Sequence, residues 1–179
     1  MDQGLGCRDD QQEVGVGQHG QALLAGPLED LLERVDADVV VLRAPSTWKL
    51  EQARRILVPS GGGRDQSPTR ARLLGNLCRA GHREVTFLRV LPASTDQETA
   101  RRAERELRRL ASDEAPRVSE AVVALRDDVV AEVGERAADS DLVILGLQRV
   151  GRRRQVFGER VLDIAQNIPG PLLMISQRS

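Results

Sequence analysis

The chain has 179 residues and a mass of 19.6 kDa, which suits one domain with a short appendage and leaves no room for two independent cores. Apolar residues make up 40% of it, enough for a packed interior, whereas the 2% aromatic content argues against recognition by ring stacking. The 26 basic and 27 acidic residues almost cancel, so no global field would attract a polyanion. We therefore expect no nucleic-acid partner.

Membrane insertion and metal chemistry also lack sequence signals. The longest purely aliphatic run, Val39 to Leu42, is far shorter than the ~20 residues of a membrane span, and the start of the chain does not have the form of a signal peptide. Cys7 and Cys78 lie far apart, without a CxxC motif or a neighbouring histidine. The sequence predicts a soluble cytoplasmic protein with no direct membrane insertion and no metal site.

The first third of the chain is predicted to hold three segments. Residues 1–25 show no periodicity and are expected to be mostly loop or disordered. Residues 26–43 have the pattern of a helix followed by a buried strand. The same order recurs at 158–175, which suggests that 26–43 is the closing half-unit of a preceding tandem module; chance similarity is the alternative. Residues 44–53 are a polar connector that Trp48 would pin onto the domain.

Residues 54–179 alternate apolar strands with amphipathic helices. Strands are expected at 55–59, 84–91, 118–125, 141–146 and 171–176. Helices are expected to begin at Ser67, Asp96, Asp127 or Asp128, and Gly158. Thr95 and Glu98 have the spacing of a capping box at the second of these helices. Strict alternation predicts the α/β class, with a parallel sheet covered by helices on both faces.

Two loops of this predicted sheet have the composition of an anion site. In an open parallel sheet, ligands bind beyond the carboxyl ends of the strands, beside helix amino termini. Glycine amides and guanidinium groups in the loops after the first and fourth strands of the domain could hold a phosphate there. The candidate residues are Ser60, Gly61, Gly62, Gly63, Gly146, Arg149, Gly151, Arg152 and Gly158. Ordinary turn glycines and solvated arginines are the alternative.

No catalytic residue is predicted. The chain lacks the P-loop motif, a GxGxxG fingerprint and a GxSxG elbow. His19 and His82 have no nucleophile in a recognisable motif and are expected at the surface. For Asp127 and Asp128, helix capping is a simpler explanation than cation binding. Glutamates lie within pairing distance along the helix near 96–114, so a salt-bridged, solvated face is expected for Arg101, Arg102, Arg105, Arg108 and Arg109.

The order of these segments resembles a universal stress protein domain, and four segments carry the resemblance: Arg55–Pro59, Glu84–Pro92, Asp141–Gly146 and Gly158–Ile175. It covers about residues 55–179, and 26–43 is similar to the end of a preceding copy in tandem members. The resemblance implies an adenine nucleotide alpha hydrolase-like fold, with a five-stranded parallel sheet in the order 3-2-1-4-5. It also implies a homodimer through the last strand.

ATP-binding members of that family carry an aspartate after the first strand and a Gly-x2-Gly-x9-Gly-Ser/Thr pattern after the fourth. Here Gly61 stands at the aspartate position, Arg149 stands at the second glycine, and Gly158 arrives one residue early. Glu159 replaces the phosphate-contacting hydroxyl, and its charge would repel a phosphate by ~1 kcal/mol or more at close range. The resemblance implies ATP as the ligand. The departures at these positions argue against the family's usual mode of ATP binding, so the sequence predicts no certain cofactor.

The run GLQRVGRRRQVFG at 146–158, with RILVPSGG at 55–62, is more similar to the cytosolic carboxy-terminal tails of bacterial amino-acid permeases of the amino acid, polyamine and organocation group. This resemblance implies a non-enzymatic regulatory or dimerisation tail, partnered by the membrane part of a transporter at the cytosolic face of the inner membrane. The alternative is a free-standing, nucleotide-binding universal stress protein, with or without a slow ATPase activity.

Overall fold

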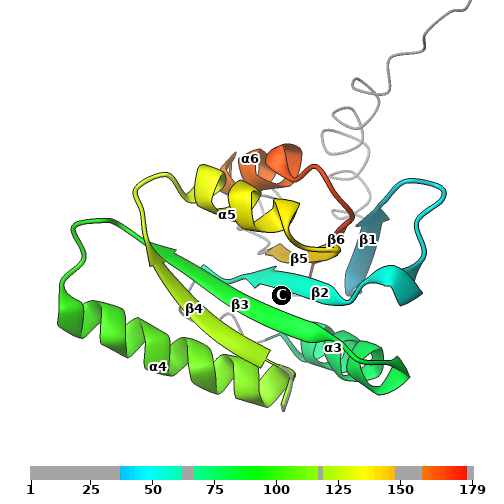
Figure 1. Ribbon diagram of the computed structural model, residues 1–179, viewed down its shortest axis with the longest axis horizontal. Coiled ribbons are helices and arrows are strands. Elements are labelled where there is room, and N and C mark those ends of the chain that lie inside the picture. Colours follow the sequence, from blue (N-terminus) through cyan, green and yellow to red (C-terminus); the bar gives the residue numbers. More distant parts are fainter. Residues whose placement is uncertain (1–36, 62–66, 117–118, 148–158, 177–179) are drawn as a thin grey trace, which may run out of the picture.

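A six-stranded mixed sheet with helices on both faces organises the chain (Figure 1). The computed structural model describes residues 37–61, 67–116, 119–147 and 159–176. Its strands are β1 Val39–Arg43, β2 Arg55–Pro59, β3 Glu84–Leu91, β4 Ser119–Leu125, β5 Leu142–Leu147 and β6 Leu172–Ser176. Its helices are α3 Pro68–Ala80, α4 Gln97–Glu114, α5 Val129–Ala138 and α6 Glu159–Asn167, with a 3-10 turn, η1, at Leu50–Gln52. The predicted alternation of strands and helices in the main domain is confirmed.

The sheet differs from the prediction in one strand. Five strands run parallel in the spatial order β6, β5, β2, β3, β4, but β1 adds a sixth strand antiparallel to β6. The order of these five parallel strands agrees with the expected 3-2-1-4-5, but the expectation that they make up the whole sheet is wrong, because the sheet has six strands and is mixed. The reason is that β1 comes from upstream of the alternating unit and pairs with β6 without the crossover helix that parallel neighbours need.

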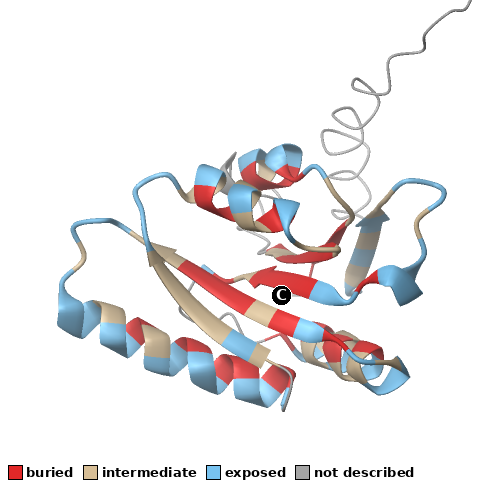
Figure 2. Cartoon of the chain, viewed as in Figure 1, coloured by how far each residue is buried: buried red, intermediate tan, exposed pale blue. Residues whose placement is uncertain are grey.

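The expectation that β1 is buried is also wrong. Val39 and Val41 are half-buried against the cluster beneath α6, but Val40 and Leu42 are 47% and 50% exposed. Side chains of a strand alternate between the two faces of a sheet, and no described helix covers the second face at β1 (Figure 2). The sequence before residue 37, which includes the predicted helix and the loop at 1–25, lies outside the described residues.

Side-chain contacts hold β1 against the domain. The Arg43 guanidinium donates to the carbonyls of Ala165 and Ile168, at 2.9 and 2.5 Å, at the end of α6. Carbonyls at a helix end have no partner within the helix, and a cation suits that end of the helix dipole. The Thr69 hydroxyl, in the first turn of α3, donates to the Asp38 carboxylate just before β1. Since β1 occupies the outer side of β6, the last strand is not a sheet edge in this chain.

Two helix starts agree with the predicted caps. The Ser67 hydroxyl accepts the N–H of Arg70 at 3.0 Å, which starts α3, and the Asp128 carboxylate accepts the N–H of Ala131 at 2.9 Å, which starts α5. Asp127 does not cap; its carboxylate accepts the N–H of Ala93 at 3.0 Å. This aspartate therefore ties the loop before α5 to the end of β3.

The capping residue of α4 differs from the prediction. Asp96 is the cap, rather than Thr95 as the capping-box spacing suggested. Its carboxylate accepts both the N–H of Thr99, at 2.9 Å, and the Thr99 hydroxyl, at 2.6 Å. These bonds lower the pKa of Asp96, and its negative charge also suits the amino end of the helix dipole. A carboxylate that accepts two hydrogen bonds there outcompetes a neutral hydroxyl one residue earlier.

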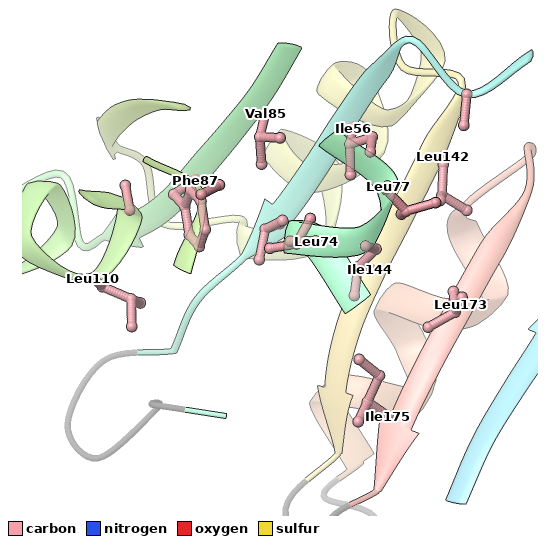
Figure 3. Packing of buried hydrophobic residues seen from close by; sticks show 14 of the residues in the cluster. Ile56, Leu74, Leu77, Val85, Phe87, Leu110, Leu142, Ile144, Leu173 and Ile175 are labelled. Atoms are coloured by element: carbon pink, nitrogen blue, oxygen red, sulfur yellow. The ribbon is translucent and has the colours of Figure 1, made fainter. Parts of the chain in front are cut away.

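The hydrophobic core lies in two layers, one on each face of the sheet. Helices α5 and α6 close the first layer, and α3 and α4 close the second (Figure 1). Alternate residues of each central strand feed the two layers, so Leu57 enters the first while Ile56 and Val58 enter the second. Figure 3 shows the second layer, where Phe87 and Leu142 are fully buried. Trp48 packs against this layer as predicted for the connector.

One carboxylate joins the starts of β2 and β5. Asp141 accepts the backbone N–H groups of Arg55 and Arg54, at 2.8 and 3.1 Å, and its other oxygen lies 3.3 Å from the Arg55 guanidinium. Burial raises the pKa of Asp141, but the hydrogen bonds from Arg55 and Arg54 outweigh it and leave the pKa below its usual value. The ionised form is therefore the one that stabilises the fold.

That pKa shift predicts how stability depends on pH. Because the folded-state pKa is lowered, the stabilisation by Asp141 is present above its unfolded-state pKa of about 3.9, and it is lost as the pH falls through the folded-state value. We expect Asp141→Asn to lower the free energy of unfolding at pH 7 and to have a smaller effect at pH 3. Urea unfolding of both proteins from pH 7 to pH 3 measures this difference; a constant difference across the range would contradict the assignment.

Candidate functional site

The site lies where the strand order reverses. Strand β2 has β3 on one side and β5 on the other, and all three are parallel, so the loops that follow β2 and β5 leave the same edge of the sheet. Leu57 pairs with Val143, and counting three residues along each strand places Ser60 level with Gly146. The ligand position predicted from the alternating pattern is therefore formed by neighbouring strands.

Three predicted site residues fall within the described part of the chain. Ser60 and Gly61 follow β2 directly, and Gly146 lies within β5, where it pairs with Ile175 of β6. Gly146 is half-buried and carries no side chain. The other candidates lie outside the described residues, and they are Gly62, Gly63, Arg149, Gly151, Arg152 and Gly158.

Ser60 has an unused hydroxyl. The residue is only 4% exposed, its N–H donates to the carbonyl of Leu88 at 2.7 Å, and its Oγ has no hydrogen-bond partner among the described residues. Leaving a buried hydroxyl unpaired costs roughly 1–3 kcal/mol, so such groups in a folded protein call for an explanation. A ligand that supplies the missing partner would explain this one.

Arg89 lies beside Ser60 and was not anticipated from the sequence. By strand alternation Ser60 shares the α3–α4 face of the sheet with Val58, and Arg89 occupies the adjoining position of β3 on that face. Arg89 is 6% exposed, and its Nη1 donates to Glu106 of α4 at 3.1 Å, while its Nε has no partner in the part of the chain that the structure describes. Hydrogen bonds from Arg102 and Arg89 lower the pKa of Glu106. A buried positive charge therefore adjoins the unpaired hydroxyl.

A buried ion pair fixes the helix that follows the first site loop. Arg70 of α3 donates from Nε and Nη2 to the two carboxylate oxygens of Glu114 at the end of α4, at 2.6 and 2.8 Å. Both side chains are at most 4% exposed. The same carboxylate accepts the N–H of Ser67 at 3.3 Å. The start of α3, and with it one end of the site loop, is thus held to the last turn of α4.

The position after β2 has room for a side chain. Gly61 is exposed, and a Cβ built there would meet no atom of the described residues within 4 Å. A carboxylate at this position would therefore be sterically tolerated. The departure from the ATP-binding pattern at Gly61 changes the charge of the site rather than its shape.

A shallow cavity lies at the opposite, amino edge of the sheet. It has a volume of about 190 Å³, and its lining includes Arg55, Thr86 and Arg136. Both arginines already have carboxylate partners, since Arg55 pairs with Asp141 and Arg136 pairs with Glu132 at 2.6 Å. No helix of the described chain begins there to present free N–H groups, so we do not assign the ligand site to this cavity.

The described residues show no arrangement for metal or thiol chemistry. Among them, no group of three histidine, cysteine or acidic side chains could hold a metal ion. Burial raises the pKa of the half-buried Cys78 thiol, which disfavours the reactive thiolate. His82 is exposed in the turn after α3, as predicted, while His19 lies outside the described residues.

Comparison with solved structures identifies the fold. A universal stress protein from Archaeoglobus fulgidus is similar with a TM-score of 0.56 and 19% identity over 68% of this chain and 93% of that one. A structure of the universal stress protein from Archaeoglobus fulgidus "in complex with dAMP" gives a TM-score of 0.55 and 18% identity over 68% and 97% of the two chains. A universal stress protein "in complex with cAMP" gives 0.52 and 15% over 69% and 97%.

The described part of the chain therefore has the universal stress protein fold, as the sequence resemblance predicted. No protein-family model matches the sequence, and no curated protein matches it either. In the parts of the chain that the structure describes, no helix is long and apolar enough to cross a bilayer.

Proposed function

We propose that the chain is a non-enzymatic, universal-stress-protein-like binding module that holds a nucleoside monophosphate at the carboxyl edge of β2 and β5. The observation that carries this proposal is the buried, unpartnered Ser60 hydroxyl at the point where the strand order reverses. Two structural neighbours whose ligands are dAMP and cAMP support the ligand class. A monophosphate carries less negative charge than a triphosphate does, which fits a sequence with Gly61 and Glu159 in place of the ATP-binding pattern.

The neighbours of Ser60 suit such a ligand. On one side Arg89 contributes a buried guanidinium whose Nε has no partner among the described residues, and on the other lies Gly146, which carries no side chain. The hydroxyl can donate to a ligand oxygen or nitrogen, and a ligand bond there removes the cost of the unpaired group. The guanidinium adds a positive charge that favours an anion.

Titration calorimetry with AMP, cyclic AMP and ATP tests the proposal. We expect Ser60→Ala to weaken AMP binding about tenfold, the equivalent of about 1.4 kcal/mol and typical of one lost hydrogen bond. The matched control is Ser140→Ala, because the Ser140 hydroxyl bonds the Arg136 carbonyl at the opposite edge of the sheet. Without ligand, Ser60→Ala should be at least as stable as the parent, since it removes an unpaired buried hydroxyl. Equal AMP affinity of the parent and Ser60→Ala would contradict the site.

The runner-up is a nucleotide-binding stress protein that holds ATP and hydrolyses it slowly. It predicts an adenine nucleotide that copurifies with the protein and is detected by mass spectrometry after denaturation. It also predicts micromolar ATP affinity that Gly146→Val abolishes, together with phosphate release above the level of a Gly146→Val control. ATP affinity well above that for AMP would favour it over the monophosphate site.

A role as the regulatory or dimerisation tail of an amino-acid transporter remains a proposal. What supports it, besides the sequence resemblance, is β1, a strand from upstream that lies outside the alternating unit yet pairs with β6. In-frame membrane spans in the coding region upstream of Met1 would support the tail and a location at the cytosolic face of the membrane. A stop codon close upstream would favour the free-standing cytoplasmic protein.

The homodimer through the last strand stays a prediction, and it requires that β1 leave its place beside β6. Because β1 pairs along all five residues of β6, two copies could join through β6 only if β1 moved away or exchanged between them. Otherwise the edges of the described sheet are β1 and β4, and Val40 and Leu42 are exposed on the face of β1 that no described helix covers. Light scattering of the full chain measures which state forms.

A further inference from the structure

The outer face of α4 carries arginines that the predicted salt bridges do not neutralise. Arg102 pairs with Glu106 at 3.1 Å and Arg108 pairs with Glu104 at 2.6 Å. The remaining three arginines of this helix are exposed and form no ion pair with any residue in the described part of the chain. They are Arg101, Arg105 and Arg109, called here the arginine stripe. The expectation of a salt-bridged face is therefore wrong for these three.

The spacing places the three arginines in one row on the helix surface, although Glu98, Glu106 and Asp113 also lie three or four residues from them. Residues four apart on a helix are neighbours on its surface, and here each four-residue step leads from one arginine to the next. Like charges at that spacing destabilise a helix, so a stripe of this kind gains from an anionic partner. Each step advances about 6 Å along the helix axis, which sets three guanidinium groups on a line of about 12 Å.

A partner of opposite charge is present in the same chain. Residues 1–36 contain eight acidic and two basic residues, a net charge of −6, whereas residues 37–179 contain 19 acidic and 24 basic residues, a net charge of +5. The near-neutral net charge of the chain is therefore the sum of an acidic amino-terminal segment and a basic remainder, called here the body. Opposite net charges on two parts of one chain attract at low ionic strength.

The segment joins the body close to the stripe. Asp38 contacts Thr69 in the first turn of α3, and the next residue, Arg70, pairs with Glu114, the last residue of α4. Arg109 precedes Glu114 by five residues, or about 8 Å along the helix. A random coil of 36 residues would have an average end-to-end distance of roughly 30 Å, which is longer than the stripe and its distance from Glu114 together. The tether also gives the segment a high effective concentration there.

We propose that the arginine stripe of α4 is the docking surface for the acidic segment at residues 1–36 of the same chain. The exposed residues of α4 are all polar or charged, with no apolar or aromatic side chain to insert into a bilayer or stack on a base. Charge complementarity with a tethered segment therefore fits the stripe better than a membrane or a nucleic acid does. The contact is independent of the proposed nucleotide site.

A spin label on the native Cys7, within the acidic segment, tests the proposal in the full chain. With Cys78→Ala as background, the label should broaden backbone amide resonances of α4 around the stripe by more than twofold in 20 mM salt. The effect should be lost in 0.5 M salt, where charges are screened beyond about 4 Å. The triple variant Arg101→Gln, Arg105→Gln, Arg109→Gln should abolish it.

The control variant removes the same number of positive charges from positions outside α4. Arg54→Gln, Arg72→Gln and Arg79→Gln, all at exposed positions, should leave the broadening of α4 unchanged. The proposal would be overturned if the broadening survived in the stripe variant or were equal over the whole surface. It would also be overturned if the control triple variant removed the broadening. So would stripe-dependent sedimentation with phosphatidylglycerol vesicles, or stripe-dependent binding of a single-stranded oligonucleotide, without any broadening of α4 by the segment.

Discussion

Glu114→Ala is expected to lower the free energy of unfolding by about 3–5 kcal/mol, because it leaves the fully buried Arg70 guanidinium without its bidentate partner. The Ser67 N–H loses an acceptor at the same time. Urea unfolding monitored by circular dichroism at pH 7 gives the difference. A loss below about 1 kcal/mol would show that water or another group takes over the role of the carboxylate.

Two further variants separate the charge effect from simple truncation. Glu104→Ala removes one partner of an exposed pair on the same helix and should cost less than about 1 kcal/mol. Replacing both buried partners, as in Arg70→Met with Glu114→Leu, should recover at least half of the loss, since the desolvation of two charges disappears together with their attraction. A double variant as unstable as Glu114→Ala would contradict this interpretation.

Leu142→Ala should have the second large effect, about 2–5 kcal/mol. Leu142 is 0% exposed at the start of β5, in the layer between the sheet and α3, and its truncation leaves a cavity that rigid neighbours fill only in part (Figure 3). Thermal and urea unfolding of the purified variant measure the loss. The expected result also bears on the site, because β5 carries Gly146 beside Ser60.

Leu125→Ala is the matched control for that variant. It removes the same atoms from the end of β4, where the leucine is 46% exposed, and should cost less than about 1 kcal/mol. Equal losses in the two leucine variants would mean that the second layer tolerates a cavity, or that Leu125 is covered in solution by a surface that the chain alone does not provide.

Part of the candidate site could be predicted from the sequence. Ser60 and Gly146 were candidates because each lies at the end of an apolar run, and parallel strands bring such ends to one edge. Arg89 could not be found in that way, because it lies within a strand whose neighbours are mostly apolar, and only packing against α4 buries its side chain. The pairing of Arg70 with Glu114 joins residues 44 positions apart, with no local pattern to mark it.

The sequence by itself determined the alternating strands and helices, and most of their ends, because periodicity and capping depend on residues within about four positions of one another. Only the tertiary structure decided that Val39–Arg43 lies antiparallel beside β6, that Asp96 rather than Thr95 starts α4, and that Ser60 keeps a buried hydroxyl without a partner. The physical reason is that strand neighbours, burial and the choice between competing hydrogen-bond acceptors depend on groups that come together only when distant parts of the chain pack.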